Sequence, residues 1–400
     1  MLPQHPGSSK GKSYHGWGTL YDSFWCCYGT GIESFSKLGD SIYFEEEGEA
    51  PGLYIIQYIS SSLDWKSGQI VINQKVDPVV SSDPYLRVTL TFSPNEGSSQ
   101  ASTLNLRIPF WTHLDGAAAT INSQSLAIPA PELMGELVWN LLIGIFGGNP
   151  GVIFNILLLM QAILYGPYLL AGHTSGDWNL KTGSAESLSD SITPIPASYN
   201  EQLISFSQDS GNSTFVLTNS NQSITMEEHP KSGTDACLQA TFRIVLNESS
   251  SSEVFGIKDV IGKSVMLEPF DLPGMLLAQQ GTDSSLAVTN SADDDGSSIF
   301  RVVSGLDGKD GTVSLESGSQ AGCYIYSGVN YKPGQSMKLS CESGSSDTGF
   351  NQGASFVMNK GLSEYHPISF VAKGDNRNFL LAPLHSFRDE FYTIYFNIQA

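Results

Sequence analysis

The second half of the chain contains a threefold internal repeat, and this repeat constrains the fold more than any other feature of the sequence. Each copy has short apolar runs of strand length, separated by residues that favour turns. The runs of the three copies lie at 204–206, 215–218 and 241–245, at 265–267, 275–278 and 299–303, and at 313–315, 324–327 and 355–358. Three copies of about four short strands predict a β-trefoil.

The part of the chain ahead of the repeat also favours strands. Gly, Ser, Thr and Asn are abundant, and long helical periodicities are few. Strand-like runs separated by turn residues lie at 53–59, 69–76, 85–92 and 103–108. In the third run, Leu86, Val88, Leu90 and Phe92 alternate with polar residues, as expected of a half-buried antiparallel strand. We therefore predict a mainly β protein, with a β-sandwich ahead of the β-trefoil.

Length and charge narrow the classes of partner. The chain has 400 residues, 40% of them hydrophobic, which is enough for two or three globular domains. Its 20 basic and 40 acidic residues give a net charge of −20, which argues against nucleic acid and anionic membrane surfaces as partners. A neutral partner such as a glycan fits this charge better. The sequence does not determine the oligomeric state.

Two adjacent cysteines, Cys26 and Cys27, lie just ahead of a predicted helix start. Thr30 and Glu33 form a capping-box pattern, so the helix should begin at about Gly31. The N-terminal end of a helix stabilises a thiolate, which is the form that attacks electrophiles and binds metals. On residue chemistry alone, however, adjacent cysteines are more often buried small hydrophobic residues or one half of a disulfide.

The sequence around this pair resembles a known family. The residues that carry the likeness are 13–18 (Ser-Tyr-His-Gly-Trp-Gly), 22–34 (Asp-Ser-Phe-Trp-Cys-Cys-Tyr-Gly-Thr-Gly-Ile-Glu-Ser) and 37–44 (Lys-Leu-Gly-Asp-Ser-Ile-Tyr-Phe). This stretch is similar to the β-L-arabinofuranosidases of glycoside hydrolase family 127 in their plant form. The match is gap-free and rich in Trp, Cys and Gly, which makes it specific.

The resemblance implies a mechanism and a metal. It makes Cys26 the nucleophile of a retaining glycosidase and Cys27 a zinc ligand, with the metal holding the Cys26 sulfur as a thiolate. The acid/base glutamate and the remaining ligands, a Glu and a Cys, come from an (α/α)6 helical barrel that precedes the cysteine pair in the family. Only residues 1–23 precede the loop that carries the pair here. We therefore expect a short barrel remnant, an incomplete zinc site and the C-terminal portion of a longer enzyme, inactive alone.

The resemblance also implies a substrate and a location. The substrate would be β-L-arabinofuranosyl residues of arabinose-containing cell-wall glycans or glycoproteins, and the intact protein would be secreted or reside in the cell wall. Residues 1–17 are polar and do not form a signal peptide. Asn212-Ser213-Thr214, Asn221-Gln222-Ser223 and Asn247-Glu248-Ser249 have the form of N-glycosylation acceptors. Such triplets are common by chance, so they add little to the case for a secretory route.

The repeat region resembles a second module, the arabinose-binding β-trefoil of α-L-arabinofuranosidase B. Its exposed aromatic residues, such as Tyr326 and Tyr331, could stack on sugar faces or equally pack in the core. A partial fourth copy at 368–382 leads into a tail that looks like the closing strands of the hydrolase's own β-domain. The predicted domains are a barrel remnant with the cysteine loop at 1–45, the β-sandwich at 46–200, the inserted β-trefoil at 201–362 and the closing strands at 363–400.

The remaining cysteines and histidines are interpreted as structural. Cys323 and Cys341 flank a hairpin-like stretch and are predicted to form a disulfide, whereas Cys237 is predicted to be a buried spare thiol. The histidines lack metal-ligand spacing; they include His15, His113, His173 and His366. The acidic residues 45–47 and Glu49 are predicted to form a solvated turn and not to supply the acid/base group.

The segment 132–160 is anomalous. Residues 137–176 contain no Asp, Glu, Lys or Arg, and 137–160 are long enough to span a bilayer. Gly147-Gly148-Asn149-Pro150 in the middle and the lack of flanking basic residues argue against a membrane helix. The other interpretations are a buried sandwich segment and an altered segment from a faulty gene model or splice. The last is favoured because the family-like pattern stops near Pro131 and resumes at 161–168.

Two functional hypotheses from different classes follow. The first is a zinc-thiolate glycoside hydrolase of the β-L-arabinofuranosidase type. The second is a non-catalytic carbohydrate-binding protein in which the β-trefoil is the only working part. The natural glycan and its leaving group are not determined by the sequence.

Overall fold

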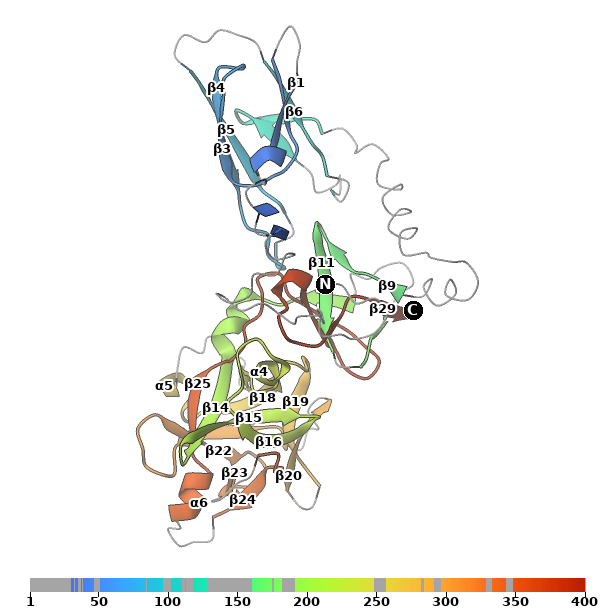
Figure 1. The fold of residues 1–400 in the computed structure, drawn as a ribbon. Coiled ribbons are helices and arrows are strands. Elements are labelled where there is room, and N and C mark those ends of the chain that lie inside the picture. The colour runs from blue at the N-terminus through green and yellow to red at the C-terminus, as the bar shows by residue number, and fades with distance from the viewer. Residues whose placement is uncertain are drawn as a thin grey trace. The chain divides into compact units, whose positions relative to one another are not determined.

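A computed structural model of the chain describes residues 30–31, 33–34, 37, 39–46, 51–83, 85–95, 102–109, 112, 118–128, 160–174, 176–181, 191–247, 257–281, 284–290, 296–328, 333–342 and 348–399. The chain divides into two compact units, one formed by 13–158 and 165–167 and the other by 1–12, 159–164 and 168–400. Both units are built mainly from β-strands, which confirms the predicted mainly β fold class (Figure 1). The expected remnant of a helical barrel stays a prediction.

The unit formed by 13–158 and 165–167 contains two three-stranded sheets and a hairpin. One sheet has the order β1-β2-β6, with β1 (Tyr43–Glu46), β2 (Gly52–Ile55) and β6 (Thr103–Leu106). The other has the order β3-β4-β5, with β3 (Ser61–Trp65), β4 (Ile70–Val76) and β5 (Val88–Pro94). A 3-10 helix, η1 (Gly39–Ser41), precedes β1, and a hairpin joins β7 (Ala119–Ile121) to β8 (Gln124–Leu126).

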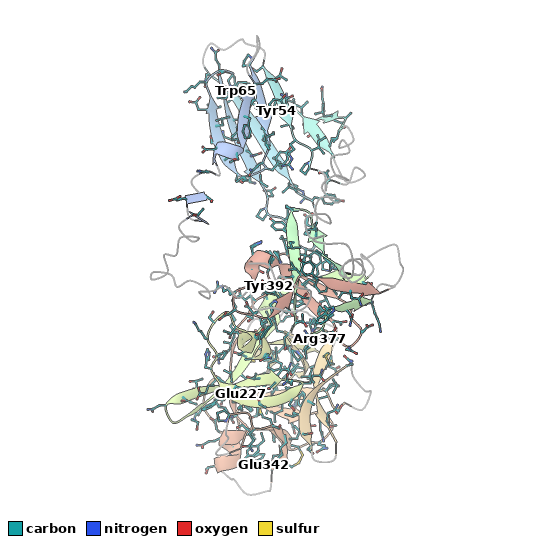
Figure 2. The ribbon with its side chains drawn as sticks, turned by 45° about the vertical axis from the view of Figure 1, so that its right-hand side comes forward. Tyr54, Trp65, Glu227, Glu342, Arg377 and Tyr392 are labelled. Atoms are coloured by element: carbon teal, nitrogen blue, oxygen red, sulfur yellow. A yellow bond between two sulfur atoms is a disulfide. The ribbon has the colours of Figure 1, made fainter. Side chains whose placement is uncertain are left out.

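One apolar layer joins the two sheets. Leu53 of β2, Trp65 of β3 and Ile72 of β4 are buried together, and Leu104 of β6 packs against them. The ring of Trp65 (Figure 2) fits because residue 68 is glycine: a Cβ there would lie 2.2 Å from the indole. Two sheets that share a buried layer form a β-sandwich.

The strands of this unit agree with the sequence in part. The four predicted runs correspond to β2, β4, β5 and β6. Sequence reasoning missed β1, β3, β7 and β8. The predicted turn was wrong for Glu45 and Glu46, which are exposed residues of β1. They lie in a strand because β1 pairs with β2 over its whole length, and the Glu45 carboxylate accepts a hydrogen bond from the Trp65 indole N–H at 2.6 Å.

Strands from before and after the repeat region form shared sheets. The larger of these, here called the flanking sheet, contains the order β11-β27-β26-β13, with β28 paired to β11. Its strands are β11 (Tyr168–His173), β13 (Ile192–Pro194), β26 (Phe370–Ala372), β27 (Phe379–Pro383) and β28 (Tyr392–Thr393), and β10 (Leu164–Tyr165) precedes them. The smaller sheet joins β9 (Met160–Gln161), β12 (Asn179–Lys181) and β29 (Phe396–Gln399). The strands between Leu203 and Lys360 therefore interrupt sheets that the tail completes.

Those intervening strands form three lobes of four. Lobe 1 contains β14 (Leu203–Ser210), β15 (Ser213–Ser220), β16 (Ser223–Glu228) and β17 (Phe242–Leu246). Lobe 2 contains β18 (Ser264–Pro269), β19 (Met275–Gln280), β20 (Ser285–Asn290) and β21 (Phe300–Ser304). Lobe 3 contains β22 (Thr312–Ser317), β23 (Cys323–Tyr326), β24 (Lys338–Cys341) and β25 (Phe356–Lys360).

The pairing of these strands closes a barrel. The first and last strands of each lobe pair in the ring β14-β17-β18-β21-β22-β25, and β25 pairs back to β14. The middle strands form the hairpins β15–β16, β19–β20 and β23–β24. These hairpins also pair with one another through β16–β20 and β20–β24. A closed barrel capped by three hairpins is a β-trefoil, as the repeat predicts.

The register identifies equivalent residues in the lobes. The buried cross-strand pairs are Leu217 with Met226, Leu277 with Val288, and Ile325 with Leu339, and all six side chains lie in one core. The sequence repeat aligns Tyr324 with Phe215, but the pairing shifts lobe 3 by one residue, so that Cys323 is equivalent to Phe215. Tyr326 is therefore equivalent to Thr218.

Short helical turns precede the last strand of lobes 1 and 3. They are α4 (Asp235–Gln239) and α6 (Thr348–Gly353). The unit formed by 1–12, 159–164 and 168–400 also contains the short helices η4 (Ala197–Gln202), α5 (Ile257–Val260) and η5 (Leu384–Ser386). The Thr241 hydroxyl donates to the Cys237 carbonyl at 2.8 Å, and the Ser355 hydroxyl donates to the Asn351 carbonyl at 2.7 Å. Because both bonds span four residues and precede the same strand, α4 and α6 are equivalent, with Ala236 matching Phe350.

The anomalous segment is outside the described residues from 132 to 159. In the part of the chain that the structure describes, no helix has the length and apolar character needed to cross a bilayer. The three interpretations of this segment and the four predicted domain boundaries remain predictions.

Candidate functional site

The cysteine pair is not placed by the structure. Outside the described residues lie Cys26, Cys27, His15, His113 and Tyr331. The predicted helix after the pair is present in part, since Thr30, Gly31, Glu33 and Ser34 are helical. Among the described residues, no three His, Cys, Asp or Glu side chains gather in a metal-binding group. The roles of Cys26 and Cys27 stay predictions.

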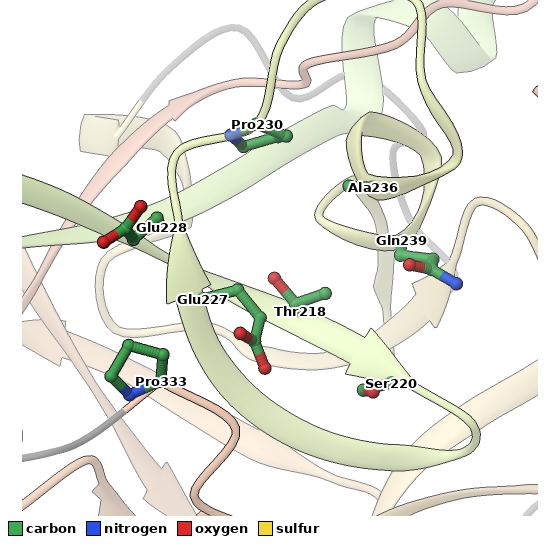
Figure 3. A pocket seen from close by; sticks show the side chains of 8 residues that line it. All are labelled: Thr218, Ser220, Glu227, Glu228, Pro230, Ala236, Gln239 and Pro333. Carbon is green, nitrogen blue, oxygen red and sulfur yellow. The ribbon is translucent and has the colours of Figure 1, made fainter. Parts of the chain in front are cut away.

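Lobe 1 carries an open pocket of about 520 Å³ between its hairpin and α4 (Figure 3). The residues that line it come from β15, β16, α4, the connection between β16 and α4, and the loop before β24. They are Thr218, Ser220, Glu227, Glu228, Pro230, Ala236, Gln239 and Pro333. Sequence reasoning placed the repeat but did not find this pocket.

The pocket presents both acceptors and donors. In Figure 3 the Glu227 carboxylate projects among Thr218, Ser220 and Pro333. One Glu227 oxygen accepts a hydrogen bond from the Thr225 hydroxyl at 2.8 Å, which fixes the carboxylate and leaves acceptor capacity facing the pocket. The Gln239 amide can donate and accept. The carboxylate, hydroxyl and amide groups of this lining can form hydrogen bonds with the hydroxyl groups of a ligand.

Strand β15, which contributes Thr218 and Ser220 to the pocket, is anchored by a hydrogen bond from a buried residue between them. Asn219, between the pocket residues Thr218 and Ser220, is buried, and its amide N–H donates to the Asp271 carboxylate at 3.1 Å. Burial raises the pKa of Asp271 to about 6, although the Asn219 hydrogen bond and the Arg377 guanidinium act in the opposite direction. Arg377 (Figure 2) in turn donates to the His173 carbonyl of the flanking sheet at 2.7 Å.

The equivalent space in lobe 3 is filled by side chains. Tyr326 and Phe350 occupy the positions of Thr218 and Ala236, and their rings stack with centroids 5.4 Å apart. Gly353 is equivalent to Gln239, and a Cβ at Gly353 would lie 2.5 Å from the Tyr326 ring. Of the two alternatives for Tyr326, the structure supports packing, since its half-buried ring stacks on the buried ring of Phe350.

The remaining cysteines are placed as predicted. Cys323 and Cys341 form a disulfide that links β23 to β24 in lobe 3. This cross-strand position corresponds to Phe215 and Glu228 in lobe 1. Cys237 of α4 is a free, buried thiol whose S–H donates to the Lys231 carbonyl at 3.1 Å.

His173 and His366, the described histidines among those named in the sequence analysis, have contacts typical of a structural role. Burial, with a smaller contribution from Arg377, lowers the pKa of His173 to about 3, so this side chain is neutral at physiological pH. Its ring stacks on Phe387 with centroids 4.2 Å apart. Burial also lowers the pKa of His366, whose ring nitrogen accepts a hydrogen bond from the Ile368 N–H at 3.0 Å.

One family model matches part of the chain. Residues 52–132 match the GH127 middle domain of β-L-arabinofuranosidase, a stretch that contains β2 to β8. The matched residues include most of the described strands of the sandwich unit. Comparison with curated protein sequences finds no match.

Several solved structures show similarity over smaller shares of the chain. A designed 3-fold symmetric protein, ThreeFoil, is 15% identical, with a TM-score of 0.27, over 39% of this chain and 97% of that chain. A Gallus interleukin-1 beta mutant is 14% identical, with a TM-score of 0.26, over 40% and 95%. A mutant GH54 α-L-arabinofuranosidase soaked with 4-nitrophenyl α-L-arabinofuranoside is 16% identical, with a TM-score of 0.31, over 43% and 33%. At these TM-scores the likeness carries no argument; the β-trefoil follows from the strand pairing.

Proposed function

We propose that this chain belongs to a retaining glycoside hydrolase that acts on β-L-arabinofuranosyl residues, and that its β-trefoil binds arabinose-containing glycans. Two features of the first third of the chain support the hydrolase: the stretch around Cys26-Cys27 that resembles family 127, and the match of residues 52–132 to the middle domain of that family. The observation that carries the glycan-binding part is the open polar pocket of lobe 1.

In the proposed reaction, the Cys26 thiolate attacks the anomeric carbon, a C–S bond forms, and the C–O bond to the leaving group breaks. A carboxylic acid gives its proton to the leaving oxygen. Water then attacks the anomeric carbon and loses a proton to that carboxylate, and cleavage of the C–S bond restores the thiolate with net retention of configuration. A zinc ion on Cys27 would keep the Cys26 sulfur deprotonated near neutral pH. We assign the acid/base role to no residue of this chain.

The pocket supports a carbohydrate ligand through its chemistry. Glu227 and Gln239 can accept hydrogen bonds from sugar hydroxyls, and the hydroxyl of Ser220 can donate or accept. Pro230 and Pro333 add apolar surface for C–H groups of a sugar ring. The net charge of −20 repels anionic ligands, whereas a neutral glycan experiences no such repulsion.

Zinc retention and turnover test the hydrolase. We expect the purified chain to retain zinc weakly through Cys26 and Cys27 and to hydrolyse an aryl β-L-arabinofuranoside negligibly, because two ligands make an incomplete site. Cys27→Ala should abolish the retained zinc measured after dialysis, whereas the control Cys237→Ala should not. Robust turnover by the chain that survives Cys26→Ala would contradict the assignment of the nucleophile.

The second candidate is a non-catalytic carbohydrate-binding protein, and the same pocket favours it. In that case glycan binding is unchanged when Cys26 and Cys27 are both replaced by alanine, and the chain shows neither zinc retention nor turnover. For either candidate we propose a secretory or cell-wall location, on the basis of the family resemblance and the Cys323–Cys341 disulfide.

A further inference from the structure

Two acceptor triplets for N-linked glycans occupy the hairpin tips at the two ends of β15 in lobe 1. The triplet at Asn212 begins in the two-residue turn between β14 and β15, where Ser210 pairs with Ser213. The triplet at Asn221 begins in the two-residue turn between β15 and β16, where Ser220 pairs with Ser223. Both asparagines are exposed.

The backbone of these turns is suited to carrying a large substituent. Gly211 has a φ of 62°, and Asn221 and Gln222 have φ values of 51° and 66°. Left-handed residues of this kind form the tight turns that match the twist of paired strands. Side chains at such a tip lie beyond the ends of the strands, so a bulky hydrophilic glycan adds no buried polar group.

The triplets are confined to one part of the chain. Every Asn-x-Ser/Thr triplet lies between residues 212 and 249, although asparagines occur throughout the sequence. The buried Asn219 has no acceptor hydroxyl two residues later, since residue 221 is asparagine. The third triplet, at Asn247, extends beyond the described residues and carries no part of the inference.

The same β-trefoil contains an independent sign of the compartment in which N-glycans are attached. Its lobe 3 is closed by the Cys323–Cys341 disulfide. Disulfides form and persist in the secretory pathway and are rare where thiols are kept reduced. A folded module with a structural disulfide and two exposed acceptor triplets therefore has both requirements for modification.

We propose that Asn212 and Asn221 are N-glycosylation sites, so that lobe 1 carries one glycan at each end of β15. The eight-residue strand β15 separates the two sites by about 26 Å, so the glycans are attached independently. Asn221 directly follows Ser220, which lines the pocket, so its glycan stands at the rim of the pocket.

Translation of the full chain behind a cleavable secretion signal, in the presence of microsomes, tests the proposal. In an Asn247→Gln background we expect two mobility steps on a gel that peptide N-glycosidase removes. Peptide mass spectrometry should then find aspartate in place of Asn212 and Asn221. Thr214→Ala and Ser223→Ala should each remove one step, because they delete the acceptor hydroxyl and leave the asparagine in place.

The chain supplies a matched control turn. Asn122 and Ser123 have φ values of 47° and 66° at the tip of the β7–β8 hairpin, which matches the turn at Asn221, but residue 124 is glutamine. Gln124→Ser creates a third triplet there and should add one step. Unmodified Asn212 and Asn221 in microsomes that glycosylate the Gln124→Ser chain would overturn the proposal.

Discussion

Lobes 1 and 3 of the β-trefoil have the same strands and the same helical turn, yet one holds a pocket and the other holds a small core. The positions occupied by Thr218 and Ala236 in lobe 1 are occupied by Tyr326 and Phe350 in lobe 3, whose rings stack. Gly353 allows the close approach of the Tyr326 ring. The difference between a binding site and a packed interior therefore includes the volume of a few side chains. The hairpins differ as well, because two residues separate β15 from β16, whereas residues 327–337 separate β23 from β24.

The core positions of the barrel next to these two sites are apolar and buried in both lobes. Leu217 in lobe 1 and Ile325 in lobe 3 are both fully buried in the shared core. The hydroxyls of Thr241 and Ser355 make the same bond to the helical turn. The lobes thus share the residues that specify the fold, while residues farther from the barrel axis are free to fill or to open the space beneath each hairpin.

Opening lobe 3 should have the largest effect on stability. Phe350 is buried against Tyr324, Tyr326 and Ala354, so Phe350→Ala removes the centre of this cluster. We expect the free energy of unfolding to fall by about 3 kcal/mol in urea titrations. The enlarged lobe 3 should not gain glycan binding, because Ser340 stands at the position of Glu227. A loss below about 1 kcal/mol would contradict the view that this lobe is packed.

Removing the disulfide should cost nearly as much. Cys323 and Cys341 are 18 residues apart in sequence, and a cross-link over a loop of this size contributes about 3 kcal/mol through the unfolded chain. We expect the double variant Cys323→Ser with Cys341→Ser to lose stability by that amount under oxidising conditions. Cys237→Ala in lobe 1 is the control for loss of a buried sulfur without a cross-link and should lower the free energy of unfolding by only about 1 kcal/mol. Equal effects would show that the disulfide does not stabilise lobe 3.

Lobe 1 lacks this cross-link and is instead held through Asn219 and Asp271. Burial raises the pKa of Asp271 from 3.8 for the free group to about 6 in the folded chain, so folding favours the protonated form of this side chain. Its contribution to stability is therefore largest below pH 4 and declines as the pH rises to about 6. Asp271→Asn should remove this decline and stabilise the chain at pH 7 by on the order of 2 kcal/mol. A wild-type stability that rises between pH 4 and 6, relative to the variant, would have the wrong sign.

A methyl group at the two equivalent helix positions should have unequal effects. Gly353→Ala places a Cβ 2.5 Å from the Tyr326 ring and 2.9 Å from the Gly328 carbonyl, so we expect a loss of about 1–2 kcal/mol. Gln239→Ala in lobe 1 faces the open pocket and should change stability by less than about 0.5 kcal/mol. Thermal unfolding of both variants measures the contrast, and similar shifts would mean that the two lobes are packed alike.

The sequence predicted the frame of the trefoil better than its site. Runs of apolar residues placed the barrel strands, because those side chains fill the core in every lobe. The third strand of each lobe was missed, since β16 mixes apolar residues with Glu227 and Glu228 and has no long apolar run. The pocket was missed for a different reason. It exists because Thr218 and Ala236 are smaller than Tyr326 and Phe350, which occupy the same positions in lobe 3. Matching these positions requires the correct register, and the degenerate sequence repeat placed lobe 3 one residue out of register.

The most direct measurement is calorimetric titration of the full chain and of Ala236→Phe with arabinofuranosyl oligosaccharides. Ala236→Phe introduces the residue that fills lobe 3, so it should weaken glycan binding at least about tenfold while the thermal unfolding midpoint stays within a few degrees. Two results would contradict the conclusion that the open space in lobe 1 is a glycan site. In the first, the unmodified chain binds the oligosaccharide and the Ala236→Phe chain binds it equally well. In the second, the unmodified chain does not bind it.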